Sequence, residues 1–137
     1  MPDTTEPRHA VWIGRSASAL VVTALLVDGA SQLFAPAKIA SMMQETGFAM
    51  ELTSRLGGIM VASALLYAIP STTVLGAILV TGFLGGAICA HVRLGELGSP
   101  PEIISLLLGV MTWGGLYLRD PRMRAILRPQ LLTGTLF

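Results

Sequence analysis

Long apolar runs that contain few charged residues dominate this sequence. They cover residues 11–34, about 49–69, 72–91 and 101–118. A helix needs about 20 mainly apolar residues to cross the hydrocarbon core of a membrane. The runs therefore predict an all-α membrane protein, in which residues 11–118 form a bundle of four transmembrane helices.

The second run is shorter than the others. Its strictly apolar part, Leu56–Ile69, would form a helix of about 21 Å, whereas the hydrocarbon core is about 30 Å thick. We therefore expect this helix to extend back through Arg55 toward Glu51, with both charges at the membrane boundary. The same argument places Glu102 at the start of the fourth helix.

The segment at residues 36–46 (PAKIASMMQET) is more polar and lies between the first two runs. Pro36 suits the first turn of a helix, and Gly47 suits its C-terminal end. Ile39 and Met43 share one face of such a helix. The segment is therefore predicted to be a short interfacial helix that lies on the membrane, and an irregular loop is the alternative.

The composition supports a membrane location and narrows the chemistry. Hydrophobic residues make up 53% of the chain, charged residues 12%, and the mean hydropathy is +0.69, whereas an ordinary globular domain is about 25% charged. A net charge of +1 is too small to indicate that the chain binds nucleic acid. The single cysteine excludes an intramolecular disulfide, and the two histidines are too few for a typical metal or haem site. We expect no metal and no covalently bound cofactor.

The basic residues predict the orientation in the membrane. With four spans, both termini lie on one side, which carries Arg8, Arg15, Arg119, Arg122, Arg124 and Arg128. The opposite side carries Lys38, Arg55 and Arg93. Because basic residues are enriched in cytoplasmic segments, we expect cytoplasmic tails at 1–10 and 119–137 and a location in the plasma (inner) membrane. Arg15 lies near the cytoplasmic end of its helix, where its long side chain can reach the interface.

The same topology places several polar side chains at one depth, near the outer leaflet. They are Asp28 and Gln32 in the first helix, Glu51 and Arg55 in the second, His91 in the third and Glu102 in the fourth. Ionisable side chains inside a membrane are unfavourable unless they are paired or hydrated, and they commonly face the interior of a bundle. The sequence therefore predicts a polar layer at this depth.

Two interpretations of the polar layer are open. In the structural one, Asp28 and Arg55 neutralise each other and fix the register of their helices. In the functional one, the layer binds a small amphipathic molecule, Asp28 and His91 exchange protons as candidate catalytic groups, and Arg55 holds an anion or a carbonyl group. The further candidate ligand-binding residues are Gln32, Glu51 and Glu102.

Small residues on the third run predict helix packing. Gly82 and Gly86 form a GxxxG motif that Ala90 extends, and such faces allow helix backbones to approach closely in a membrane. The motif is compatible with packing inside the monomer and with packing in a homo-oligomer.

Several stretches of the chain resemble a known family. They are WIGR, LLVDGASQLF, RLGGIMVASALLYAIPSTTVLGAILVTGFLGGAICAHVR and WGGLYLRDPRMR. Together, from about Trp12 to Arg124, they resemble the DoxX-like family of small four-helix membrane proteins, which takes its name from a membrane subunit of a thiosulfate:quinone oxidoreductase. The resemblance implies a four-helix bundle and makes a quinone or another lipophilic molecule the expected ligand. It identifies family positions without assigning them roles: Arg15, Asp28, Arg55, His91 and Arg93.

Three functions are compatible with the sequence. The first is the membrane subunit of an oxidoreductase that binds a quinone through Asp28, Arg55 and His91, while a soluble redox partner supplies electrons. The second is an acid–base enzyme (an isomerase, epoxide hydrolase or cyclase) for a lipophilic substrate, with Asp28 or Glu51 as the acid and His91 as the base. The third is a non-catalytic scaffold or assembly factor. The expected partners are the lipid bilayer, a lipophilic small molecule and either a soluble redox partner or a second copy of the chain, and not nucleic acid.

Overall fold

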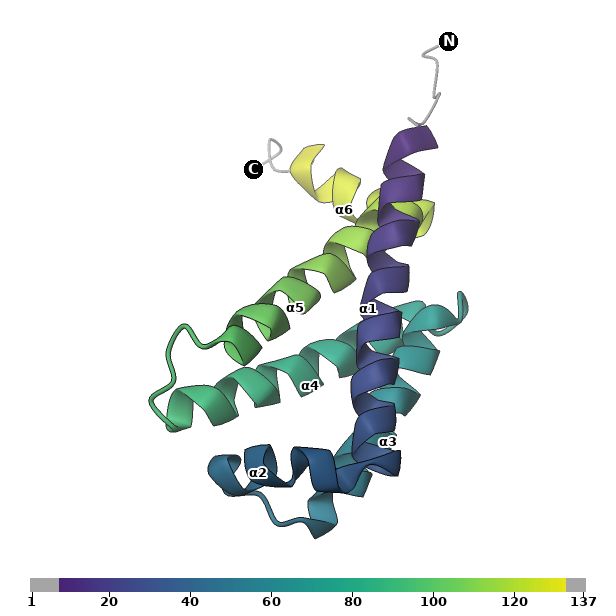
Figure 1. The fold of residues 1–137 in the computed structure, drawn as a ribbon. Coiled ribbons are helices and arrows are strands. Elements are labelled where there is room, and N and C mark those ends of the chain that lie inside the picture. The colour runs from purple at the N-terminus through teal and green to yellow at the C-terminus, as the bar shows by residue number, and fades with distance from the viewer. Residues whose placement is uncertain (1–7, 133–137) are drawn as a thin grey trace.

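The computed structural model describes residues 8–132, with side chains for residues 8–126. Over this range the chain is helical and contains no strand, which confirms the predicted all-α class. The helices are α1 (Arg8–Phe34), α2 (Pro36–Thr46), α3 (Glu51–Ala68), α4 (Thr73–Arg93), α5 (Pro100–Arg119) and α6 (Pro121–Leu132) (Figure 1). The tails predicted at 1–10 and 119–137 lie partly outside the described residues.

The ends of α2 follow the local signals in the sequence. The helix covers residues 36–46, the range that the sequence predicts. Pro36 occupies its first turn, where the missing N–H leaves no hydrogen bond unmade. Gly47 ends the helix with a φ of 73° and donates its N–H to the carbonyl of Gln44. Only glycine adopts this left-handed conformation without strain.

The helix α6 follows Arg119 and was not predicted from the sequence. Asp120 precedes it and accepts a 2.8 Å hydrogen bond from the backbone N–H of Arg122. Pro121 is the first helical residue. An aspartate cap followed by proline is a favourable helix start. The residues Asp120 and Pro121, which follow the end of α5, therefore begin α6.

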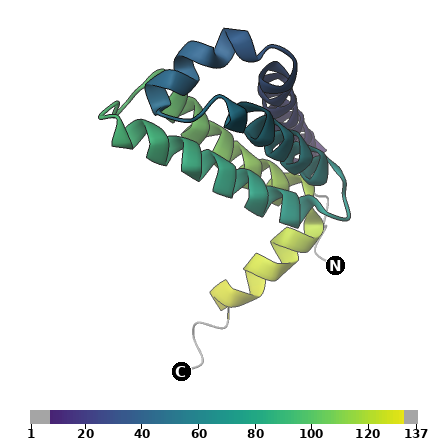
Figure 2. The same ribbon diagram turned by 90° about the horizontal axis from the view of Figure 1, so that it is seen from below.

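Four helices form the body of the molecule. α1 packs against α3 and α5, and α4 packs against the same two helices, so the order around the body is α1, α3, α4, α5 (Figures 1 and 2). α2 contacts α1 and α3. α6 contacts α5 and projects away from the body (Figure 2). The start of α1 and α6 lie at one end of the molecule, and α2 lies at the other (Figure 1).

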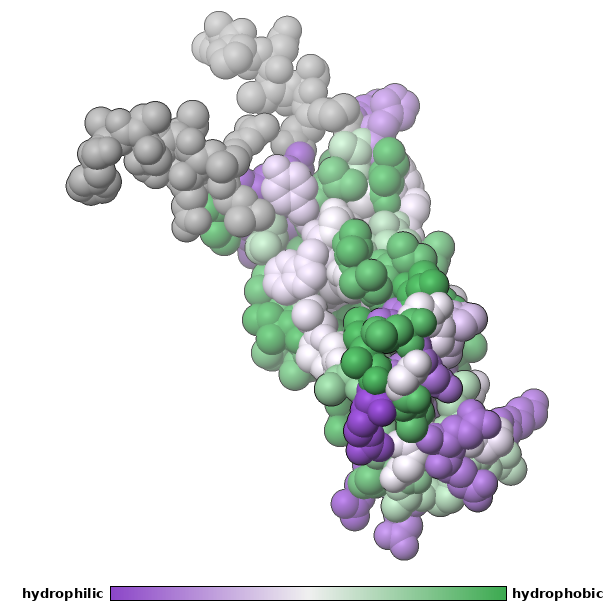
Figure 3. Space-filling model, turned by 90° about the vertical axis from the view of Figure 1, so that its left-hand side faces the viewer, coloured by the Kyte–Doolittle hydropathy of each residue, from purple (hydrophilic) through white to green (hydrophobic). Residues whose placement is uncertain are grey.

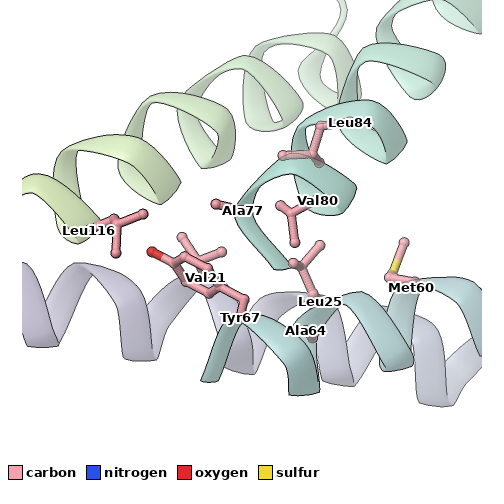
Figure 4. Close-up of a cluster of buried hydrophobic side chains, with 9 residues drawn as sticks. All are labelled: Val21, Leu25, Met60, Ala64, Tyr67, Ala77, Val80, Leu84 and Leu116. Atoms are coloured by element: carbon pink, nitrogen blue, oxygen red, sulfur yellow. The ribbon is translucent and has the colours of Figure 1, made fainter. Parts of the chain in front are cut away.

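A buried cluster lies where these helices meet. Its members come from all four helices of the body: Val21, Leu25, Met60, Ala64, Tyr67, Ala77, Val80, Leu84 and Leu116 (Figure 4). Tyr67 is fully buried. Its hydroxyl donates a 2.7 Å hydrogen bond to the carbonyl of Thr112 on α5 and lies 3.0 Å from the hydroxyl of Ser18 on α1. One side chain thus links α3 to both α1 and α5.

Glycines mark the closest contacts between helices. A Cβ on Gly14 of α1 would lie 2.8 Å from the backbone of α5, and a Cβ on Gly57 of α3 would lie 2.9 Å from the carbonyl oxygen of Gly29 on α1. In contrast, no neighbouring atom of the described residues lies within 4 Å of a Cβ placed on Gly82 or Gly86. The two glycines of the predicted GxxxG face therefore do not pack against the described part of the monomer.

Apolar side chains cover the outside of the body. Exposed large hydrophobic residues occur on α1, α3, α4 and α5, among them Leu20, Val27, Ile59, Ile78, Leu106 and Val110. Figure 3 shows hydrophobic side chains over the middle of one face and hydrophilic ones toward its lower end. Such broad apolar surfaces are typical of helices that face lipid.

Three helices are long and apolar enough to cross a membrane, namely α1, α4 and α5. α2 and α3 pass the same test only as a pair, which is bent by 105°. α3 has 18 residues and is therefore about 27 Å long, and its first two turns contain Glu51 and Arg55. The described residues thus contain three candidate spans, or four if the bent pair counts as one.

Candidate functional site

Asp28 and Gln32 lie together near the C-terminal end of α1, as their spacing predicts. The Gln32 Nε2 donates a 3.3 Å hydrogen bond to the Asp28 Oδ2. The Asp28 side chain is exposed, whereas Gln32 is only 8% exposed, and its Oε1 has no hydrogen-bond partner among the described residues. A buried amide oxygen without a partner is unfavourable, so a donor from a ligand would stabilise it.

The contact between α1 and α3 positions Gln32. A Cβ on Gly57 would lie 2.9 Å from the Gln32 Cβ. Glycine at position 57 therefore leaves the space that the Gln32 side chain occupies. Thr53, one turn before Gly57 on the same face of α3, is fully buried, and its Oγ1 also has no described partner. Buried hydroxyls elsewhere, such as that of Ser63, bond to the carbonyl four residues earlier in their own helix. For Thr53 that residue is Ala49, which lies outside α3.

The Asp28–Arg55 ion pair of the structural interpretation is not among the described contacts. Both side chains are exposed, and the ion pair found among residues 8–126 joins His91 to Glu96 instead. The reason lies in helix geometry. Thr53 and Gly57 of α3 face α1, and Arg55 is two residues from each, so its side chain leaves the other side of the helix.

His91 and Glu102 hold the connection between α4 and α5. The His91 Nδ1 lies 2.8 Å from the Glu96 Oε2. The Glu102 carboxylate accepts a 2.7 Å hydrogen bond from the backbone N–H of Gly98. No described hydrogen bond or ion pair joins either residue to Asp28. Glu51, at the start of α3, is exposed as well. The residues predicted to form one polar layer therefore form separate local groups.

Arg93, the last residue of α4, ties α2 to the body. Its Nη2 donates a 2.8 Å hydrogen bond to the backbone carbonyl of Thr46, the last residue of α2. A cation at this position also interacts favourably with the C-terminal end of the helix. The C-terminal ends of α2 and α4 therefore lie side by side.

The opposite end of the molecule holds a polar group that the sequence analysis missed. Arg119 donates a 3.1 Å hydrogen bond to the backbone carbonyl of Tyr67, and its guanidinium lies 5.0 Å from the centroid of the Tyr67 ring. Arg15 lines the same cleft as Arg119, with its guanidinium 5.7 Å from the ring of Trp12. Counting residues along the predicted helices, as was done for the polar layer, also places Arg15 and Arg119 at one depth. The sequence could therefore have predicted that the two arginines lie near the same end of the bundle.

A family model described as the DoxX-like family matches residues 16–115. This range contains α2, α3 and α4 completely, most of α1 and α5, and the three residues Asp28, Gln32 and Thr53. No curated protein and no solved structure matches the chain. The match covers most of the sequence, and together with the long apolar helices it leads to one conclusion: the chain belongs to the DoxX-like family and is an integral membrane protein.

Proposed function

We propose that the chain is a four-span membrane protein that binds a small lipophilic molecule at the contact of α1 and α3, beside the exposed Asp28 carboxylate. The closed packing order of α1, α3, α4 and α5 supports four spans. The 105° bend between α2 and α3 supports an interfacial α2, because a helix nearly perpendicular to a span lies along the membrane plane. In this arrangement Arg93 holds α2 against the body at the membrane surface.

We further propose that both termini are cytoplasmic and that the membrane is the plasma membrane, because basic residues concentrate near the termini. A reporter enzyme that is active only in the periplasm should be silent when it is fused after Phe137. The same reporter inserted between Gly95 and Gly98, in the α4–α5 connection, should be active and is the matched control. A periplasmic signal from the Phe137 fusion would contradict this orientation and would move Asp28 to the inner leaflet.

One observation carries the ligand proposal. Two buried polar atoms, the Gln32 Oε1 and the Thr53 Oγ1, have no partner among the described residues, and they lie on the α1–α3 interface that also carries the exposed Asp28 carboxylate. A buried donor or acceptor without a partner is about 1–3 kcal/mol less stable than a paired one. A ligand that supplies the missing partners gains this free energy. Its carbonyl oxygen would accept from the Thr53 hydroxyl, and its hydroxyl would donate to Gln32 or Asp28.

A quinone has this combination of groups. Its oxidised form carries carbonyl acceptors, and its reduced form carries hydroxyl donors. The Asp28 carboxylate is the group that would take or return a proton at the ligand hydroxyl. The chain has a single cysteine, Cys89, and no CxxC motif, so we propose that a soluble redox partner supplies the electrons. The chain would then be the membrane subunit of an oxidoreductase.

A second candidate function is a scaffold or a homo-oligomer. Gly82, Gly85 and Gly86 on α4 have no neighbouring atom of the described chain within 4 Å of an added Cβ. Faces of small residues are where membrane helices commonly associate. The acid–base enzyme has no comparable support, because the described contacts of His91 lead to Glu96 and not to Asp28.

Mass spectrometry of small molecules that copurify in mild detergent tests the ligand proposal. We expect a quinone or another defined lipophilic molecule with the wild type, and about ten-fold less of it with Asp28→Asn, because a charge-assisted hydrogen bond contributes about 1.5–3 kcal/mol. Thr53→Val should also lower the yield. Its thermal stability should not fall, because the lost hydroxyl has no protein partner among the described residues.

The matched control is Glu45→Gln, which removes an exposed carboxylate from α2, outside the proposed site. It should copurify as much ligand as the wild type. If every sample contains bulk phospholipid alone, the ligand proposal fails and the scaffold function is favoured.

A further inference from the structure

A positively charged cleft lies at the end of the molecule that carries the start of α1 and α6. Its volume is about 540 Å³, and its lining includes Arg15, Arg119, Asp120 and Arg122 together with Pro70, Ser71 and Thr73 at the α3–α4 connection. Three arginines and one aspartate give a formal charge of +2. The Asp120 carboxylate is already engaged, because it accepts the hydrogen bond from the backbone N–H of Arg122. The cleft therefore attracts anions.

The guanidinium groups that line the cleft have N–H donors available for a ligand. Arg15 is exposed, and its described contact is the stacking on Trp12, which leaves its N–H groups unused. Arg122 is exposed as well. Arg119 donates one N–H to the carbonyl of Tyr67. A guanidinium has five N–H donors. Several N–H groups from three side chains can thus reach one ligand.

A second hollow continues from the cleft along the lipid-facing surface. Arg15 and Arg119 line both hollows. The second has a volume of about 310 Å³, and its remaining walls are Ser18, Ala19, Val22, Thr23 and Ala68. Since Arg15 and Thr23 are eight residues apart on α1, the groove runs about 12 Å from the arginines toward the middle of the membrane. Its walls are small and mostly apolar, as an acyl chain requires.

We propose that the two hollows together bind an anionic phospholipid. The headgroup phosphate lies on Arg15, Arg119 and Arg122, and one acyl chain lies in the groove between Ala19 and Ala68. Phosphate oxygens match the planar fork of a guanidinium and can accept two hydrogen bonds from it. The exposed Trp12 places this end at the membrane–water interface, where lipid phosphates lie. Basic pockets between membrane helices are suited to such headgroups. The site is independent of the quinone proposal, which concerns the other end of α1.

Native mass spectrometry of the delipidated full chain tests the headgroup site. We expect phosphatidylglycerol and diphosphatidylglycerol to bind more tightly than phosphatidylcholine. Arg15→Gln and Arg122→Gln should each lower the affinity for the anionic lipids about five-fold. Arg8→Gln removes the same charge at the same end, outside the cleft, and should change nothing. Arg119 is left intact because it also holds Tyr67.

Two further measurements distinguish a bound lipid from a bound inorganic anion and from a general effect of charge. Ala68→Leu fills the groove and should lower lipid binding, whereas Ala62→Leu, on an exposed part of α3 outside the groove, should not. If inorganic phosphate alone displaces the lipid, the cleft is an anion site without a lipid function and the proposal is overturned. An equal loss of affinity in Arg8→Gln and Arg15→Gln would overturn it too, because the preference would then follow from the overall charge of the chain.

Discussion

Replacement of Gly76 by alanine is expected to destabilise the chain by about 3 kcal/mol or more. Gly76 lies in the first turn of α4, directly against the end of α3. An added Cβ would overlap backbone atoms of Tyr67 and Leu66. A backbone cannot rotate away as a flexible side chain does, so α3 and α4 would have to separate. Thermal or denaturant unfolding in detergent measures the loss.

Gly82→Ala is the matched control for this prediction. It adds the same methyl group to the same helix, at a position with no neighbouring atom of the described residues within 4 Å. Alanine is more favourable than glycine inside a helix by about 0.5–1 kcal/mol, so this variant should be as stable as the wild type or slightly more stable. Equal stability of the two variants would show that α3 and α4 do not approach as closely as described.

Tyr67→Ala is expected to destabilise the protein by about 3–5 kcal/mol, the usual range for removing a large buried aromatic side chain. Tyr67 is fully buried in the central cluster and bonds to Thr112 and Ser18 through its hydroxyl. Tyr67→Phe keeps the ring and removes these bonds, so it should lose only about 1 kcal/mol. Unfolding measurements on both variants separate packing from hydrogen bonding.

The second tyrosine of the chain provides the control. Tyr117 is 39% exposed on α5, and Tyr117→Ala should change the stability by about 0.5 kcal/mol or less. The Tyr67 variants also bear on the cleft, because the guanidinium of Arg119 lies over the Tyr67 ring. Anionic lipid binding should survive Tyr67→Phe. A large loss of stability in Tyr67→Phe, or equal losses in Tyr67→Ala and Tyr117→Ala, would contradict the described role of Tyr67.

The class of the protein and the positions of α1 to α5 could be predicted from the sequence, because both depend on local features, whereas α6 was missed. The length of an apolar run indicates a span. Pro36 and Gly47 mark the two ends of α2, because one lacks an N–H and the other tolerates a positive φ. The Asp28–Gln32 contact follows from a spacing of four residues on one helix.

The rotation of each helix about its own axis could not be predicted in this way, and the candidate site depends on it. In a soluble protein the apolar face of a helix turns inward, but here lipid and interior are both apolar. The buried positions of α1 include Gly14, Ser18 and Gln32 as well as Val21 and Leu25, whereas large residues such as Val27 face outward. Hydrophobicity alone therefore does not distinguish the two faces.

The same ambiguity accounts for the errors about the polar residues. Counting along the helices predicts one depth for Asp28 and Arg55, yet no described contact joins them, because packing at Gly57 turns Arg55 away from α1. Arg15 and Arg119 are distant in the sequence and line one cleft because α1 and α5 touch through Gly14 and the backbone of α5. Depth follows from counting residues along a helix. Which side chains meet at that depth follows from the packing of small residues between helices, and that packing exists only in the folded chain.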